Sequence, residues 1–215
     1  MPKGSPELTA SRKEEIINAC EKLYQTMSFK EITIKDIGAV TSFTRTSIYN
    51  YFQTKEEIFL ALMQREYELW AAEVNTLAEE HNTMSANDFA AAMAHSLEKH
   101  EQLLKLLAMN HYDMEENSRP ERLAEFKTAY AASLDAVRTC VRKFFPDTDC
   151  ESFIFVFFPF LFGVYPYSVA TQKQLDAMRE AGMEFRMHSI FEIIYSCVMQ
   201  LIAQNRPSKG NEVSR

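Results

Sequence analysis

The segment TRTSIYN, residues 44–50, holds the side chains whose chemistry is easiest to assign. Threonine, arginine, serine, tyrosine and asparagine exchange hydrogen bonds with the phosphates and base edges of DNA. Arg45 is the candidate for a bidentate contact with guanine, and a contact with phosphate alone is the alternative. Thr44 and Thr46 stand beside it, where a recognition helix would begin. Ser47, Tyr49 and Asn50 are expected to make phosphate or mixed contacts.

Two short helices joined by a turn would position these residues. Thr33 and Asp36 fit a capping box, and Ile32 and Ile37 fit a hydrophobic staple around the same helix start. The small polar residues of Thr41-Ser42-Phe43 predict the turn. Thr44 would then cap a second helix over residues 44–52, with inward-facing apolar residues Ile48, Tyr51 and Phe52.

Two further residues are candidates for phosphate contacts. Lys55 lies in the first turn of the next predicted helix, where the helix N-terminus itself attracts an anion. Thr33 stands at the start of the first short helix and could bind a phosphate in the same way. Both would position the protein on the duplex without reading its sequence.

This order of residues resembles the DNA-binding domain of the tetracycline-repressor (TetR) family of bacterial transcription regulators. The resemblance covers about residues 11–60 and implies that Tyr49 binds phosphate. It rests on Phe29, Ile32-Thr33, Asp36-Ile37, Thr44, Ser47-Ile48-Tyr49, Tyr51-Phe52 and Lys55-Glu56. An all-helical core without DNA contact is the alternative interpretation of the same residues.

The sequence departs from this family's pattern at two positions. Ser42 stands where glycine is usual in the turn, so the turn must tolerate a side chain. We expect Ser42 to adopt a positive φ, at a small cost in free energy. Gly38 stands where alanine is usual, which weakens a helix by up to about 1 kcal/mol.

Charge is divided unevenly along the 215 residues. Residues 1–55 hold 8 of the 23 Lys and Arg residues and 6 of the 30 Asp and Glu residues, so they carry a net charge of +2. The remainder carries −9. Non-specific affinity for DNA should therefore be modest and sensitive to salt.

Several function classes are not supported. No nucleophile elbow, HExxH motif, phosphate-binding glycine loop or CxxC pair is present, so we expect no enzyme, cofactor or metal site. His111 and Asp113 are too weak a pair to indicate a metal. The four scattered cysteines predict reduced thiols in a cytoplasmic protein, with a redox pair of Cys140 and Cys150 as the alternative.

The first eleven residues, MPKGSPELTAS, contain no apolar stretch, so we expect no signal peptide. The apolar run of residues 153–167 is 15 residues long and contains Pro159, Gly163 and Pro166. It is too short and too interrupted to span a bilayer, so we expect a buried helix and no membrane association.

The predicted fold is all-α, with an N-terminal three-helix helix-turn-helix domain followed by a larger helical ligand-binding and dimerisation domain. The expected divisions are a flexible arm (1–10), the DNA-binding domain (11–54), the helical domain (55–205) and a disordered tail (206–215). Further capping pairs, Ser-x-x-Glu or similar, mark helix starts at Ser11/Glu14, Thr54/Glu57, Ser85/Asp88 and Ser118/Glu121.

The second domain is rich in aromatic and methionine side chains, which suit a roomy apolar pocket. They favour a lipophilic or aromatic effector, while plain core packing is the alternative for each residue. The candidates are Met63, Tyr67, Trp70, Phe89, Met93, Leu97, Met109, Tyr112, Phe126, Tyr130, Phe158, Phe162 and Tyr165.

Two predicted helices, near 150–171 and 184–204, are more apolar than a monomer requires. We expect them to pair with their copies in a homodimer, as the resemblance also implies. Two recognition helices would then meet successive major grooves of a palindromic site.

The sequence thus favours a DNA-binding transcriptional regulator, usually a repressor in this family, that leaves a palindromic operator when a small effector binds. Two alternatives remain. One is a regulator controlled by a protein partner, and the other is a helical small-molecule-binding protein with a vestigial DNA head.

Overall fold

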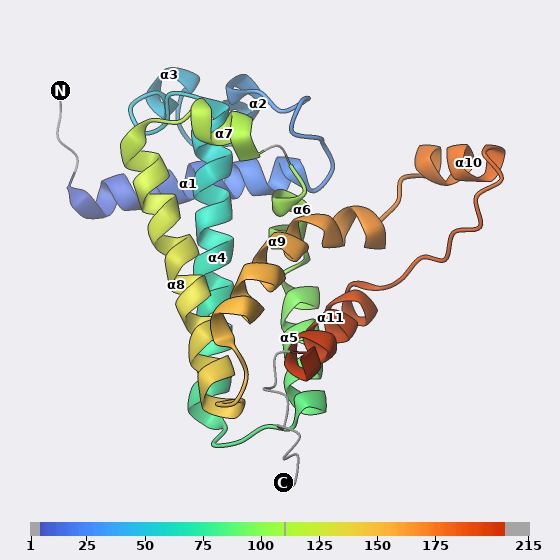
Figure 1. Ribbon diagram of the computed structural model, residues 1–215. Helices are drawn as coiled ribbons and strands as arrows, with labels where there is room; N and C mark the ends of the chain where they lie inside the picture. The colour runs from blue at the N-terminus through green and yellow to red at the C-terminus, as the bar shows by residue number, and fades with distance from the viewer. Residues whose placement is uncertain (1–4, 110, 205–215) are drawn as a thin grey trace, which may run out of the picture. The chain divides into compact units, whose positions relative to one another are not determined.

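The structure is a computed structural model that describes residues 5–109 and 111–204. Within these ranges the chain forms eleven α-helices and no strand (Figure 1). The all-α prediction is therefore confirmed. The described chain divides into two compact units, one formed by residues 5–65 and 111–129 and the other by residues 66–109 and 130–204.

The first unit contains the predicted helix-turn-helix. It comprises α1 (Pro6–Tyr24), α2 (Ile34–Ala39), α3 (Arg45–Ile48), the first part of α4 (Lys55–Glu80), α7 (His111–Glu116) and the first part of α8 (Pro120–Phe144). Apolar residues at helical spacing meet in its core, where the Phe59 ring makes edge contacts with Tyr24 and Phe29. Other fully buried members are Ile16, Cys20, Ile32, Ile37 and Ile48.

The start of α1 corrects one boundary. The sequence predicts a flexible arm over residues 1–10 and a helix start at Ser11, but the helix begins at Pro6. The Ser5 hydroxyl accepts a hydrogen bond from the Leu8 N–H at 3.2 Å, and proline at the first helical position needs no N–H partner. Residues 1–4 lie outside the described chain.

The second unit contains α5 (Ala86–Lys99), α6 (Glu101–Leu107), α9 (Cys150–Ser168), α10 (Gln172–Glu180), α11 (Ile190–Gln204) and the remaining parts of α4 and α8. Figure 1 shows α11 alongside α5 and α10 standing apart from the other helices of this unit. Helix α10 buries no residue, whereas α9 contributes more buried apolar residues to this unit than any other helix.

Several element boundaries differ from the predictions because local patterns were misjudged. Ser118 does not cap α8; its hydroxyl donates to the Met114 carbonyl at 2.7 Å, at the end of the unpredicted helix α7. The final helix begins at Ile190 rather than near residue 184, with the Glu192 carboxylate accepting from the Ser189 N–H. The predicted disordered tail, 206–215, lies outside the described residues.

Helix α9 is the one described helix that is long and apolar enough to cross a membrane. That test rests on length and composition only, and core helices of globular proteins also pass it. The helix contains Pro159 and Pro166, and 39% of its most apolar window is buried inside the second unit.

Candidate nucleic-acid interface and second pocket

Helix α3 presents the predicted DNA-contacting residues to solvent. It spans only Arg45–Ile48, shorter than the predicted 44–52, and continues as a turn through Tyr51. Ile48 on its inner side is fully buried. Ser47 is partly exposed, and the exposed members of the predicted set are Thr44, Arg45, Thr46, Tyr49 and Asn50.

The polar side chains of α3 also bond to one another. The Arg45 guanidinium donates to the Tyr49 hydroxyl at 3.2 Å and lies 5.8 Å from the centre of its ring. The hydroxyls of Thr44 and Ser47 are 3.1 Å apart, and Thr44 makes no side-chain bond to the helix backbone. The exposed face is therefore an ordered set of donors and acceptors without DNA.

Helix α2 begins as the capping pattern predicts. The Thr33 hydroxyl accepts from the Asp36 N–H, and the Asp36 carboxylate accepts from the Thr33 N–H at 2.9 Å. The Thr33 hydroxyl also donates to that carboxylate, and these bonds lower the pKa of Asp36. Thr33 is exposed, and both members of the staple, Ile32 and Ile37, are fully buried.

Gly38 has a packing role that helix propensity did not indicate. A Cβ atom at this position would lie 3.2 Å from the Arg45 Cα and 3.3 Å from the Arg45 Cβ. Such distances are shorter than comfortable van der Waals contact. The glycine thus lets α2 approach the start of α3 closely.

The turn before α3 is anchored to α1 by Ser42. Its N–H and its hydroxyl both donate to the Glu15 carboxylate, the hydroxyl at 3.0 Å. The backbone bond and then the side-chain bond lower the pKa of Glu15. Positive φ was expected at Ser42 and is wrong, since no described residue other than glycine has it. The side chain that replaces glycine makes the anchoring contact.

Lys55 holds a loop of the first unit together. Its ammonium donates to the carbonyls of Phe29 at 2.7 Å and Ile32 at 3.2 Å, and lies 4.1 Å from the centre of the Phe29 ring. These partners belong to the segment between α1 and α2. A phosphate contact by Lys55 would compete with these bonds.

An ion pair between the buried Glu57 and the partly exposed Arg119 fixes the start of α4. Glu57 is 1% exposed, and its carboxylate accepts from Arg119 Nε at 2.6 Å, Arg119 Nη2 at 2.8 Å and the Gln53 N–H at 2.8 Å. Burial alone raises the pKa of Glu57, but the bonds from Arg119 and Gln53 outweigh it and leave the pKa below its usual value. Glu57 is therefore a paired, ionised carboxylate.

Arg119 also reaches the turn that follows the recognition helix. The Tyr51 carbonyl accepts from Arg119 Nη2 at 3.1 Å and from Arg122 Nη2 at 3.3 Å. The Arg122 guanidinium also lies 5.5 Å from the centre of the Phe52 ring. The segment between α7 and α8, together with the first turn of α8, thus supports the turn that follows the recognition helix. Sequence reasoning missed this support because the partners are more than 60 residues apart.

The predicted effector residues fall into two groups. In the second unit, Tyr67, Trp70, Phe89, Met93, Leu97 and Phe158 are buried, whereas Tyr130, Tyr165 and Met109 are partly buried and Phe162 is exposed. Rings pack edge to face in this core, with Tyr130 touching Tyr67 and Phe158. The first unit holds the buried Met63 and Phe126 and the exposed Tyr112.

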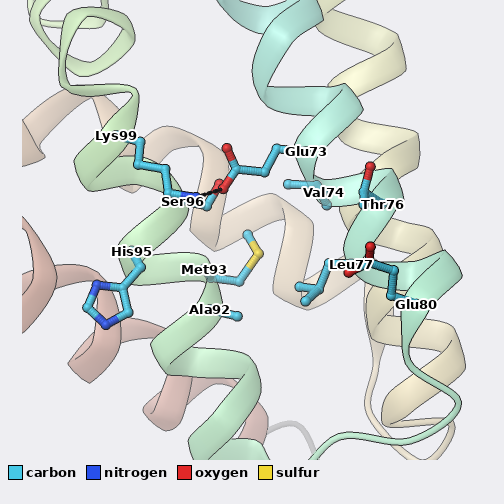
Figure 2. Close-up of a pocket in the computed structure, with 10 residues that line it drawn as sticks. All are labelled: Glu73, Val74, Thr76, Leu77, Glu80, Ala92, Met93, His95, Ser96 and Lys99. Carbon is cyan, nitrogen blue, oxygen red and sulfur yellow. Dashed lines mark hydrogen bonds and ion pairs between the residues drawn. The ribbon is translucent and has the colours of Figure 1, made fainter.

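A separate pocket of about 340 Å³ lies between α4 and α5 in the second unit (Figure 2). Of the predicted effector residues, Met93 is the one that lines it. Val74 and Leu77 of α4 and Ala92 of α5 complete its apolar floor. Its lining also includes polar residues, among them Ser96, whose buried hydroxyl has no hydrogen-bond partner among the described residues.

Family comparisons cover nearly all of the described chain. Residues 16–62 match the family described as bacterial regulatory proteins, tetR family, and residues 64–204 match the tetracyclin repressor-like C-terminal domain. The two matches meet at residues 62–64, and the boundary at 54/55 stays a prediction. A search of curated protein sequences found no match.

Solved structures share the fold at low sequence identity. A TetR/AcrR-family transcriptional regulator from Thermobifida fusca has a TM-score of 0.58 at 16% identity, covering 92% of this chain and 100% of that one. The fatty acid degradation regulator FadR from Bacillus halodurans gives 0.53 at 15%, covering 99% and 100%. SmeT, the repressor of the Stenotrophomonas maltophilia efflux pump SmeDEF, gives 0.52 at 17%, covering 92% and 91%.

The family assignment thus rests on two adjoining matches and agrees with the geometry. The first match contains the exposed polar face of α3 and the capped helix α2. The second covers more than half of the chain. The chain belongs to the TetR family of bacterial regulatory proteins, and it is a DNA-binding transcriptional regulator.

Proposed function

We propose that this regulator is a repressor that binds a palindromic operator as a homodimer and releases it when a small lipophilic or aromatic effector binds the C-terminal domain. The observation that carries the DNA-binding part is the solvent-exposed polar face at the start of α3. Its inner side is closed by the buried Ile48, so only one face is available to a ligand. A cytoplasmic location follows from this function.

The residues of this face take different roles in the proposal. Arg45, with Thr44 and Thr46, reads base edges, because these residues open the recognition helix. Ser47, Tyr49 and Asn50 contact phosphate or both phosphate and bases, and Thr33 binds phosphate from the start of α2. Lys55 supports the interface through its two carbonyl bonds, and a phosphate contact by its ammonium would compete with them.

Exposed apolar side chains support the homodimer. On α9, Phe155 is 80% exposed and Tyr167 is 65% exposed, and Val156 and Phe162 are exposed beside them. Large apolar side chains gathered on one helix are costly in water, and a second copy of the chain would cover them. Helix α11 lines the same surface with Phe191 and Ile193, so α9 and α11 together would form the interface.

Selection of bound sequences from a random DNA library tests the proposal. The purified dimer should enrich a palindrome at near-physiological salt. Arg45→Ala should weaken binding to that palindrome by about tenfold to a hundredfold, since a bidentate base contact contributes about 1–3 kcal/mol. Lys30→Ala, an exposed change in the same unit but outside α3, is the matched control.

Two results would contradict the proposal. A folded dimer that enriches no sequence, with or without candidate effectors, would favour a small-molecule-binding protein with a vestigial DNA head. An enriched sequence bound as tightly by Arg45→Ala as by the wild type would remove the base-reading role from Arg45.

A further inference from the structure

The pocket between α4 and α5 has features of a binding site for a particular chemical class. The inference about this pocket rests on the proposed function in one respect: the molecule that binds the pocket would be the effector. The floor is apolar, and Met93 is fully buried there. A volume of about 340 Å³ lies at the lower end of the range for small-molecule pockets.

The Ser96 hydroxyl is the first polar feature that points to a ligand. Ser96 is 6% exposed and lines the pocket, and its Oγ has no partner among the described residues. Buried hydroxyls in folded proteins are nearly always hydrogen-bonded, because an unmade bond costs free energy. A polar group on a bound molecule would satisfy this one.

The charges of the rim supply the second feature. At one end of the pocket, Glu73 is already paired, since it accepts from Lys99 Nζ at 2.9 Å and lies 3.3 Å from His100 Nε2. At the other end, the Glu80 carboxylate makes no hydrogen bond or ion pair with any described residue. Figure 2 shows Lys99 and Glu80 at opposite ends, with Met93 and Leu77 between them.

Helix geometry sets the length of the site. Glu73 and Glu80 are seven residues apart, so they lie on one face of α4 about 10 Å apart along its axis. A molecule filling the space between them needs an apolar body of that order. The end at Glu73 is close to neutral because this carboxylate is paired. The end at Glu80 is therefore the one that attracts a positive charge.

We propose that this pocket binds an amphipathic primary amine, with its ammonium at Glu80, its apolar body over Met93 and Leu77, and a hydrogen-bonding group near Ser96. A protonated amine is selected because the unpaired rim charge is negative. An anionic ligand is disfavoured by the same carboxylate.

Calorimetric titration of the full-length protein with phenylpropylamine tests the class and the place. The probe has an aromatic body and one ammonium group. Phenylpropanol and phenylpropanoate replace the cation with a neutral group and an anion. We expect the amine to bind at least about tenfold more tightly than either, because a charge-assisted hydrogen bond is lost in both.

Three variants locate the site. Glu80→Gln should weaken the amine by about tenfold. Glu79→Gln removes a neighbouring exposed charge that does not line the pocket, and it should leave the affinity for the amine unchanged. Ser96→Ala should fold at least as stably as the wild type, because it removes an unpartnered group, and should leave binding of the probe unchanged, because the probe has no second polar group to meet the Ser96 hydroxyl.

The results separate this inference from the repressor proposal. Equal binding of the three probes, equal losses in Glu79→Gln and Glu80→Gln, or no binding of the amine would overturn the pocket assignment, even if the protein enriches a palindrome. Selective amine binding lost in Glu80→Gln, without any DNA enrichment, would support the pocket and overturn the repressor.

Discussion

The Glu57 carboxylate is held at both oxygens by the guanidinium of Arg119, a residue 62 positions further along the chain. Arg119 also bonds the Tyr51 carbonyl, so one side chain joins the first turn of α4 to the end of the recognition segment. The pair lies within the first unit, behind the exposed face of α3. The Glu57–Arg119 pair therefore supports the candidate interface from inside the unit and is not one of the proposed DNA contacts.

Arg119→Ala should destabilise the first unit and weaken DNA binding together. Removing Arg119 leaves the buried Glu57 carboxylate without its charged partner, which costs about 1–3 kcal/mol, less than in a fully buried pair because the Arg119 side chain is 36% exposed. Denaturant unfolding, read alongside DNA titration, measures both effects. Arg138→Ala, which breaks surface ion pairs with Asp135 and Glu151 in the second unit, should cost under about 1 kcal/mol. Equal costs for the two variants would contradict the special role of Arg119.

Lys55→Ala separates a structural role from a phosphate contact. Losing the bonds to Phe29 and Ile32 should lower the free energy of unfolding by about 1–3 kcal/mol. The slope of log affinity for DNA against log salt concentration should stay the same, since no counterion release is lost. A slope smaller by about 0.9 would show instead that the ammonium neutralises a phosphate.

Gly38→Ala should disturb DNA binding more than folding. The new methyl group would press on Arg45 at 3.2 Å from its Cα, while the helix gains up to about 1 kcal/mol in propensity. We therefore expect a shift in thermal stability of either sign but small size, and a loss of operator affinity of several fold. Unchanged affinity would mean that α2 and α3 adjust without moving Arg45.

His100 should make the second unit less stable as pH rises above neutrality. The Glu66 carboxylate, 3.9 Å from His100 Nδ1, is the largest cause that raises the pKa of His100 above 6.5, and Glu73 adds to it against the effect of burial. A raised folded-state pKa gives stability that is complete below about 6.5 and lost as pH rises through the folded value. Thermal unfolding of the wild type and His100→Gln across this range should converge at high pH.

Local patterns that span three or four residues could be predicted from the sequence, and contacts between residues far apart in the chain could not. The capping pairs at Thr33/Asp36 and Ser85/Asp88 formed as predicted, since a side chain at the N-cap meets the backbone three residues on in any helix. The same pattern at Ser118 failed, because the local rule cannot tell a helix start from the end of α7.

The candidate sites show the same division. Exposure of Arg45 and burial of Ile48 follow from helical spacing, so the sequence predicted the outer face of α3 correctly. Aromatic content alone does not distinguish a pocket wall from a packed core, as Tyr67 and Trp70 illustrate. Pairing of Ser42 with Glu15 has no sequence signature, because it depends on how the turn before α3 packs against α1.

The reach of Arg119 also bears on the construction of chimeric regulators. A head exchanged at residue 62 or 63, between the two family matches, would carry Glu57 and Tyr51 into a new protein without residues 111–129. Its buried carboxylate would then depend on whatever side chain the recipient supplies at that place. An exchange of DNA specificity therefore requires that the head and residues 111–129 are transferred together. A single splice site is insufficient for this regulator.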